Sequence, residues 1–337
     1  DPFTGQLAFT KNQDDPLEVD AVIVDETSMV DVSLMAALLA ALRGDCRLVL
    51  VGDPDQLPSV GPGNVLDHLL RSGVVPAVSL TEIFRQAQES AIVMNAHGVN
   101  RGSVPQLKNN TKDFFYLGRR DAARTVDTVV ELCQSRLPQN MGIPAEQIQV
   151  LTPTRKRGAG TAALNRALQE ALNPAAEGRS ERAFGPYIFR EGDRVMQVKN
   201  NYDLFWEDPD TGAKDLGVFN GDIGIIQEVT VGGITVSFDG RLVAYPPELL
   251  GELEPAYAVT VHKAQGSEYR AVILALSDVP PSLLARGVLY TAITRARELF
   301  IMVGSGELLA QMTANDRQTR RYSALRTRLL RETGQET

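Results

Sequence analysis

Carboxylates follow the first short apolar run of the sequence. Asp25 and Glu26 come directly after residues 19–24, a valine-rich run that predicts a strand. At such a strand end, one carboxylate can hold Mg²⁺, usually through water, and the other can polarise an attacking water. A polar turn without chemistry fits the same two residues equally well when they are considered alone.

A second polar segment follows the next apolar run, residues 47–51. Gly52 and Asp53 come first, and ligands of open parallel sheets bind where such strands end, so both are expected at the edge that carries the first carboxylates. The amide of Gln56 can bond both a phosphate oxygen and a water, which would let it report a terminal phosphate. Pro58 stiffens the loop that follows. The alternative is a polar loop with a chance glutamine.

Hydroxyl and basic side chains gather after a predicted strand over residues 147–151. Thr152 and Thr154 lead into the basic run 155–157, which precedes a predicted helix over residues 160–172. Hydroxyls, backbone amides and a helix N-terminus together can bind a phosphate backbone. A solvated basic turn is the alternative.

The segment AYAVTVHKAQGSEY brings polar residues to the end of another predicted strand. It delivers Thr260, His262 and Lys263, followed by Gly266 and Glu268. No nucleophile and acid accompany the histidine in a catalytic pattern, so hydrogen bonding to nucleic acid is its better role.

Arginines in two segments are suited to phosphate. Arg85, in LTEIFRQ, is a planar cation that could clamp a phosphate, or simply form a surface salt bridge. The segment VLYTAITRAR predicts an amphipathic helix that places Arg295 and Arg297 near one another. One of them, reaching a nucleotide across a cleft, would act as an arginine finger; a helix with a cationic face is the alternative.

The elements that must position these residues alternate between short apolar runs and helix-like segments. This pattern predicts parallel α/β sheets covered by helices on both faces, with one helix over residues 30–43 closed by Gly44. Residues 185–253 instead consist of short strands separated by turns, which predicts a small antiparallel β-barrel or sheet. We expect three units: residues 1–88, residues 89–184 with 254–337, and the barrel inserted in the second unit.

Composition sets broad limits on the function. The 337 residues are 43% hydrophobic and 23% charged, as in an ordinary globular protein, and the net charge is −8. A protein that coats nucleic acid is usually basic, although a motor can hold its strand in one local groove. Cys46 and Cys133 form no C-x-x-C pair, so two isolated thiols fit a reducing cytosol. No signal peptide or membrane span is predicted, and we expect a cytoplasmic protein.

Taken in order, the motifs resemble those of superfamily 1 DNA helicases, and most closely the RecD type. The resemblance spans about residues 19–305 and rests on an ordered set: VDE, GDPDQLP, FRQ, LTPTRK, TVHKAQGSE and YTAITRAR. It implies two RecA-like motor domains, the first incomplete, with ATP bound between them. Closure would be favourable only while the γ-phosphate is present, so hydrolysis would reopen the cleft and advance the strand. RecD-type enzymes move 5′ to 3′.

The resemblance also implies a role for each matching residue. Asp25 would coordinate Mg²⁺ and Glu26 would activate the hydrolytic water. The γ-phosphate would be contacted by Gln56, Arg85 and Arg295. Other nucleotide contacts would come from Gly52, Asp53, Gly266 and Glu268. The single-strand path would be lined by Pro58, Thr152, Thr154, Asn201, Thr260, His262 and Lys263.

One expected motif of this family is missing from the sequence. The phosphate-binding loop G-x-x-x-x-G-K-[ST] would precede VDE, but no Gly-Lys pair occurs anywhere in the chain. We therefore expect a fragment that, alone, hydrolyses ATP poorly or not at all.

Expected partners are single-stranded DNA, its junctions with duplex and a recombination or repair complex, but no membrane. Open alternatives are the helicase portion of a conjugative relaxase, a nucleotide-independent single-strand binding module and a structural subunit with a degenerate motor.

Overall fold

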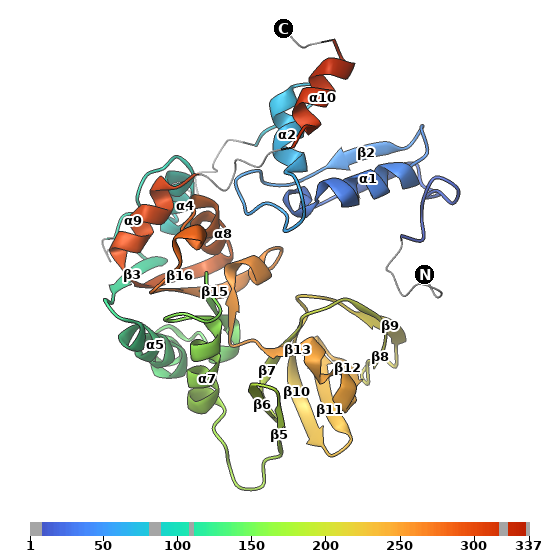
Figure 1. Cartoon of the computed structure of the whole chain (residues 1–337). Helices are drawn as coiled ribbons and strands as arrows, with labels where there is room; N and C mark the ends of the chain where they lie inside the picture. The colour runs from blue at the N-terminus through green and yellow to red at the C-terminus, as the bar shows by residue number, and fades with distance from the viewer. Residues whose placement is uncertain (1–8, 81–88, 108–110, 317–322, 335–337) are drawn as a thin grey trace.

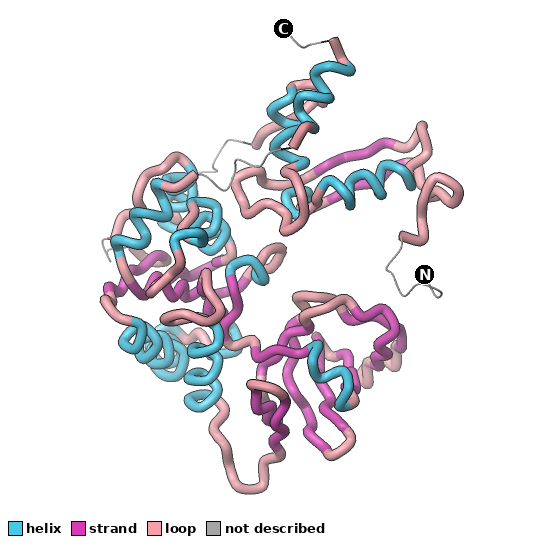
Figure 2. The backbone as a smooth tube through the Cα atoms, in the orientation of Figure 1, coloured by secondary structure: helices cyan, strands magenta, loops and turns pink. Residues whose placement is uncertain are grey.

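The computed structural model describes residues 9–80, 89–107, 111–316 and 323–334. Its elements form three groups, each built around its own sheet (Figure 1). Helices accompany parallel strands in two groups, whereas strands dominate the third (Figure 2). The predicted fold class, parallel α/β sheets with an additional antiparallel module, is confirmed.

The first group, named here the N-terminal lobe, pairs two parallel strands. Its elements are β1 (Ala21–Val24), η1 (Thr27–Met29), α1 (Val32–Ala41), β2 (Arg47–Leu50), α2 (Val65–Ser72) and α10 (Leu325–Glu332). The expected boundaries place residues 254–337 in the second unit, but α10 packs against α2. Leu325 joins the apolar cluster of this lobe, and Ser323 Oγ lies 2.8 Å from His68 Nδ1.

Two expectations for the N-terminal lobe differ from the structure. The first helix covers Val32–Ala41 rather than residues 30–43, because the Asp31 side chain caps its start and Leu42 is already extended. The sheet is not covered on both faces by the described residues. Helix α1 covers one face, and Ile23 on the other face is 71% exposed.

The second group, named here the parallel domain, is a five-stranded parallel sheet in the order β14-β4-β15-β16-β3. Its strands are β3 (Phe114–Gly118), β4 (Ile148–Thr152), β14 (Ala258–Thr260), β15 (Tyr269–Leu276) and β16 (Ala296–Gly304). Its helices are α4 (Ala91–Asn100), α5 (Ala122–Glu131), η2 (Leu132–Arg136), α6 (Leu137–Met141), η3 (Ala145–Gln147), α7 (Thr161–Leu172), η5 (Val261–Ala264), η6 (Pro281–Leu283), α8 (Arg286–Thr294) and α9 (Gly306–Ala314).

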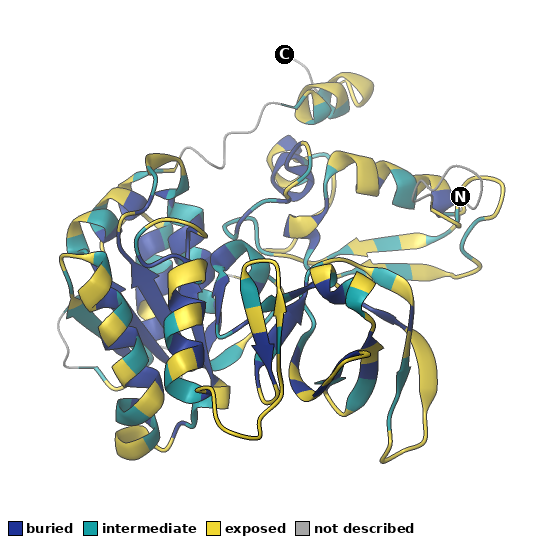
Figure 3. Cartoon of the chain, turned by 60° about the horizontal axis from the view of Figure 1, so that its bottom comes forward, coloured by how far each residue is buried: buried dark blue, intermediate teal, exposed yellow. Residues whose placement is uncertain are grey.

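Helices cover both faces of this second sheet, as predicted. Side chains of β15 alternate between the two cores: Val272 and Leu274 pack toward α4, α8 and α9, whereas Ala271 and Ile273 pack toward α5 and α7. Every residue from Ala271 to Leu276 is buried, which explains the continuous apolar run in the sequence. Figure 3 shows these strands in dark blue, in contrast to the yellow and teal strands of the N-terminal lobe.

The predicted helix over VLYTAITRAR ends earlier than expected. Helix α8 stops at Thr294, Arg295 caps it, and Arg297 already lies in β16. The two arginines therefore do not share one helical face: Arg295 is buried, and Arg297 is exposed. The break occurs because β16 must begin at Ala296, where it pairs with Tyr269 of β15.

The third group, named here the β module, is a seven-stranded antiparallel sheet in the order β13-β7-β10-β11-β12-β8-β9. Its strands are β7 (Arg194–Gln197), β8 (Asn201–Glu207), β9 (Lys214–Val218), β10 (Ile223–Thr230), β11 (Gly233–Phe238), β12 (Arg241–Tyr245) and β13 (Leu253–Pro255), with η4 (Pro247–Glu252). The hairpin of β5 (Glu181–Phe184) and β6 (Tyr187–Arg190) adds Phe189 to the same core. A two-residue turn with positive φ at Asp239 and Gly240 joins β11 to β12.

Candidate functional site

The two carboxylates after β1 occupy a strained turn. Glu26 has a φ of 50°, in the left-handed region that residues with a side chain rarely adopt. Its amide donates to Asp25 Oδ1 at 2.8 Å, which fixes the exposed aspartate at the end of the strand. Such strain persists only where surrounding structure imposes it, and it is concentrated at functional sites.

Gly52 brings the end of β2 against this turn. The Thr27 amide donates to Val51 O at 2.9 Å, and a Cβ at Gly52 would lie 3.0 Å from that same amide nitrogen. A side chain at position 52 would therefore be crowded against this amide and against Leu66, and its neighbours would have to shift. The structure thus brings the Asp25–Glu26 turn and the start of the Asp53 loop together, as the sequence predicts.

The loop of residues 53–57, named here the linking loop, reaches from the N-terminal lobe to the parallel domain. Its backbone at Leu57 is held twice, because the Leu57 amide donates to Thr291 Oγ1 at 3.0 Å and its carbonyl accepts from Gln265 Nε2 at 2.7 Å. Tyr290 donates its hydroxyl to Asp53 Oδ2 at 2.8 Å. The side chain of Asn100 donates to Asp55. These bonds come from α4, from α8 and from Gln265 directly after η5, so three segments of the parallel domain position one loop.

Burial shapes the electrostatics of the linking loop. It raises the pKa of Asp55, and the nearby charge of Asp53 adds to this, against the hydrogen bond from Asn100. Burial, followed by the charge and hydrogen bond of Asp53, also raises the pKa of Tyr290. Tyr290 therefore stays protonated at neutral pH and can donate its hydroxyl hydrogen to Asp53.

Six buried side-chain atoms have no hydrogen-bond partner among the described residues. They include Gln56 Oε1, in the linking loop, and Arg295 Nε, at the end of α8. Arg295 is 4% exposed and uses its other nitrogens on Ser267 O at 3.1 Å and Thr294 Oγ1 at 3.3 Å. Its charge acts on Tyr290, the residue that binds Asp53. A buried guanidinium nitrogen and a buried amide oxygen without partners fit the place of a polar, charged ligand.

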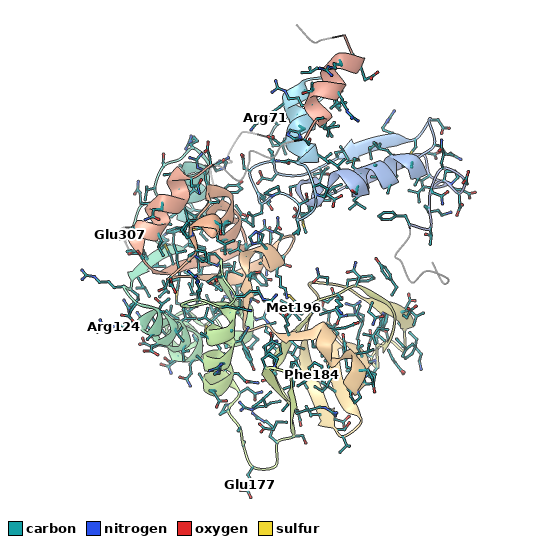
Figure 4. The ribbon with its side chains drawn as sticks, in the orientation of Figure 1. Arg71, Arg124, Glu177, Phe184, Met196 and Glu307 are labelled. Atoms are coloured by element: carbon teal, nitrogen blue, oxygen red, sulfur yellow. The ribbon has the colours of Figure 1, made fainter. Side chains whose placement is uncertain are left out.

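A second polar cluster lies where the parallel domain meets the β module. Glu254 of β13 accepts from Arg155 at 2.5 Å and from Lys263 at 2.8 Å. The cluster borders a cavity of about 620 Å³ between α7, β6 and η5. Met196, which also lines it, lies near the centre of Figure 4, where the two groups join. Arg155 and Lys263, two basic residues of the segments predicted to bind a phosphate backbone, are thus already paired with a carboxylate.

The remaining predicted residues are placed as follows. Thr152 and Thr154 are buried, and Thr260 Oγ1 accepts from the Lys263 amide at 3.3 Å. Asn201 donates its amide to Glu252 Oε2 at 3.1 Å, inside the β module. Their assignment to a strand path stays a prediction, as does that of half-buried His262 and Pro58.

On the nucleotide side, Gly266 has a φ of 76° and Glu268 is exposed, and their contact with a nucleotide stays a prediction. Arg85 lies outside the described residues.

Sequence reasoning missed the residues that join these elements. Asn100, Thr291 and Tyr290 hold the linking loop, and Glu254 holds the basic pair. Tyr290 and Thr291 lie within a motif that the sequence singled out, so a search for donors there would have found them. Glu254 is 99 positions from Arg155, and no local pattern links the two.

Metal and membrane features are limited in the part of the chain that the structure describes. It holds no group of three or more His, Cys, Asp or Glu side chains arranged to bind a metal ion. Cys46 and Cys133 are both free thiols. None of its helices combines the length and apolarity that crossing a membrane requires.

Known families match three successive parts of the chain. Residues 5–115 match an AAA domain, and residues 255–303 match the UvrD-like helicase C-terminal domain. Residues 164–238 match the ATP-dependent RecD-like DNA helicase SH3 domain. The chain belongs to the RecD-like helicase family. In this RecD-like chain, the linking loop lies in the AAA match. Its partners Tyr290 and Thr291 lie in the UvrD-like match.

Curated relatives agree with this family. The chain is 36% identical over 321 residues to the ATP-dependent RecD2 DNA helicase of Deinococcus radiodurans, covering 95% of this chain and 41% of that protein. It is 29% identical over 336 residues to the RecBCD enzyme subunit RecD of Mycobacterium tuberculosis, covering 95% of this chain and 55% of that protein. The RecD-like chain thus spans about half the length of these relatives.

Solved structures share the fold. The Pif1 helicase from Bacteroides in complex with ADP-AlF3 and ssDNA superposes with a TM-score of 0.50 at 18% identity, covering 95% of this chain and 76% of that one. The Pif1 helicase from Candida albicans gives a TM-score of 0.51 at 17% identity, covering 95% and 77%. At these identities, the two structures show that the RecD-like chain shares their fold, and nothing further.

Proposed function

We propose that this chain is part of an ATP-dependent 5′ to 3′ DNA helicase that couples nucleotide hydrolysis to movement along single-stranded DNA. The observation that carries the proposal is the linking loop. It begins beside the carboxylates of the N-terminal lobe and is held by Tyr290, Thr291 and Gln265 of the parallel domain. A motor needs this kind of connection, because a change at the nucleotide must alter how two domains contact each other.

The proposed nucleotide site uses side chains from both sides of this connection. Asp25 would hold Mg²⁺, and Glu26 would take up the proton of the attacking water. Gln56 and Arg295 would contact the terminal phosphate, which agrees with their unpartnered buried atoms. ATP would supply the phosphoanhydride whose hydrolysis drives the cycle, and Mg²⁺ would neutralise charge on its phosphates.

The proposed strand path crosses the parallel domain near η5. Lys263 is the charged residue of that path, with Thr260 and His262 beside it. The cation would bind phosphate and contribute affinity without reading the base sequence. The enzyme would unwind DNA at junctions between single strand and duplex. It would act in the cytoplasm, as part of a recombination or repair complex.

Replacing Glu26 tests the proposal in the protein that carries this chain. Glu26→Gln should lower single-strand-stimulated ATP hydrolysis by about 100-fold or more, because general-base catalysis contributes about 10²–10⁴ in rate. Nucleotide binding, measured with a fluorescent analogue, should stay within about 2-fold, since Gln keeps the size of the side chain.

Glu18→Gln is the matched control, because Glu18 is an exposed carboxylate of the same lobe outside the proposed site. Its hydrolysis rate should equal that of the unaltered protein. Normal hydrolysis by Glu26→Gln would contradict the assignment. Single-strand binding in the unaltered protein with no coupling to nucleotide would contradict the motor function itself.

A further inference from the structure

Glu254 occupies the position that an anionic ligand would take between two cations. Its carboxylate accepts from Arg155 Nη2 at 2.5 Å through one oxygen and from Lys263 Nζ at 2.8 Å through the other. Arg155 comes from the loop after β4, Glu254 from β13 and Lys263 from η5. These segments are distant in the sequence and meet only in the folded chain. A carboxylate held at two oxygens by a guanidinium and an ammonium has the same bonding pattern as a phosphodiester held by both cations.

The surroundings of Glu254 also suit an anion. The adjoining cavity of about 620 Å³ has Lys156 and Arg166 in its wall beside Arg155 and Lys263. Arg190, a further basic residue of the wall, is taken up by Glu170 at 2.8 Å and by Glu181 at 3.0 Å. The wall thus holds five basic side chains and two carboxylates, Glu170 and Glu254.

The bridge is exposed enough to be exchanged. The Arg155 side chain is 54% exposed, and those of Glu254 and Lys263 are 25% exposed. Ion pairs this open to solvent contribute little to folding stability. Burial alone would raise the pKa of Glu254, but Lys263 and Arg155 outweigh it and hold that pKa below its ordinary value. Glu254 is therefore an anion at neutral pH, in contact with water.

We propose that Glu254 is a built-in competitor for nucleic-acid phosphate: it pairs with Arg155 and Lys263 when no strand is bound, and a phosphodiester of single-stranded DNA displaces it. The idea rests on the proposed function, because it assigns a regulator to the proposed strand path. Its consequence is kinetic. An internal anion that returns as the phosphate leaves lowers the affinity and speeds release, which a motor that must let go of its strand at every step requires.

Glu254→Gln tests this in the protein that carries the chain. Glutamine keeps the length and hydrogen-bonding oxygen of the side chain but removes the competing charge. Binding of a fluorescent oligothymidylate should tighten by about 2- to 5-fold, the scale of an exposed ion pair. The slope of log K against log [salt] should steepen by up to about 0.7, the value for one additional phosphate contact on a single strand.

Two further variants separate the possible failures. Lys263→Ala should weaken binding, because it removes a cation of the path. Glu298→Gln is the matched control, because Glu298 of β16 pairs with Arg270 of β15 at 2.8 Å and neither residue lines the cavity. Its binding should not change. If Glu254→Gln is poorly folded by circular dichroism, Glu254→Thr replaces it, since β-branched residues suit a strand.

Each result has one meaning. If Lys263→Ala weakens binding but Glu254→Gln leaves it unchanged or weakens it too, Glu254 is only a structural anchor and the competitor idea is wrong. If the unaltered protein does not bind the oligonucleotide, the proposed function fails and the competitor role fails with it. Tighter binding with a steeper salt slope, seen in Glu254→Gln and absent in Glu298→Gln, is the outcome that supports the proposal.

Discussion

The two parallel sheets of this chain differ sharply in how well they are buried. In the parallel domain, β15 is enclosed from Ala271 to Leu276 by helices on both faces. In the N-terminal lobe, β1 alternates between exposed and half-buried residues, and Ile23 lies open to solvent. Parallel strands are ordinarily covered on both faces. The carboxylates of the proposed site therefore follow a strand of the less enclosed sheet, and Arg295 directly precedes β16 of the well-enclosed one.

This contrast explains why the linking loop matters. Within this chain, the described residues cover the strand pair of the N-terminal lobe on one face. Asp53, Asp55 and Leu57 are instead held by hydrogen bonds from the parallel domain. Side chains of the parallel domain thus hold the loop that follows the strand ends of the other lobe.

The largest effect that would sharpen this comparison is expected in the core of the parallel domain. Leu274→Ala removes a side chain that is fully buried in the middle of β15. It should lower the free energy of unfolding by about 2–5 kcal/mol, the usual cost of such a cavity. Urea unfolding monitored by circular dichroism measures the change.

Ile23→Ala is the matched substitution in the other sheet. Because this side chain is exposed, its loss should cost less than about 1 kcal/mol, within the range of strand propensity. Equal losses for the two variants would mean that the face of β1 bearing Ile23 is covered in solution, and the contrast between the sheets would be wrong.

A smaller effect is expected at the connection itself. Tyr290→Phe removes the hydroxyl that donates to Asp53 while keeping the ring. The loss should be about 1–2 kcal/mol, because hydrogen bonds to charged groups are worth about 1.5–3 kcal/mol and the half-buried Asp53 can regain water. It should appear as faster hydrogen exchange at the Leu57 amide, which Thr291 otherwise protects.

Tyr116→Phe is the control for this substitution. Its hydroxyl donates to Gly304 O at 3.3 Å within the parallel domain, so the exchange rate at Leu57 should not change. If both variants speed exchange at Leu57 equally, the linking loop is not held by Tyr290 in particular.

Local chemistry explains which features the sequence could predict. The continuous apolar run 271–276 and the valine-rich run before Asp25 identify strands because burial is visible in composition. The end of α8 at Thr294 could not be predicted in the same way, since the pattern continues as if helical and only the pairing of Tyr269 with Ala296 stops it. The packing of α10 on α2 depends on Leu325 meeting residues more than 250 positions earlier, which no periodicity encodes.

In the candidate site, too, local sequence predicts some features and contacts between distant segments determine the others. Strand ends bring Asp25, Gly52 and Asp53 together, as their positions after β1 and β2 predict. The donors that fix the linking loop and the carboxylate of Glu254 come from distant segments that only the folded chain brings together.

The most direct measurement of the central claim compares two neighbouring arginines in the protein that carries this chain. Arg295 is buried at the end of α8, where its charge acts on Tyr290, whereas Arg297 is exposed on β16. Arg295→Ala should lower single-strand-stimulated ATP hydrolysis by about 10³-fold, the smaller end of the range for an arginine finger. Arg297→Ala should hydrolyse ATP at nearly the normal rate. Equal rates for the two variants, with both folded, would contradict the account that one site joins the N-terminal lobe to the parallel domain.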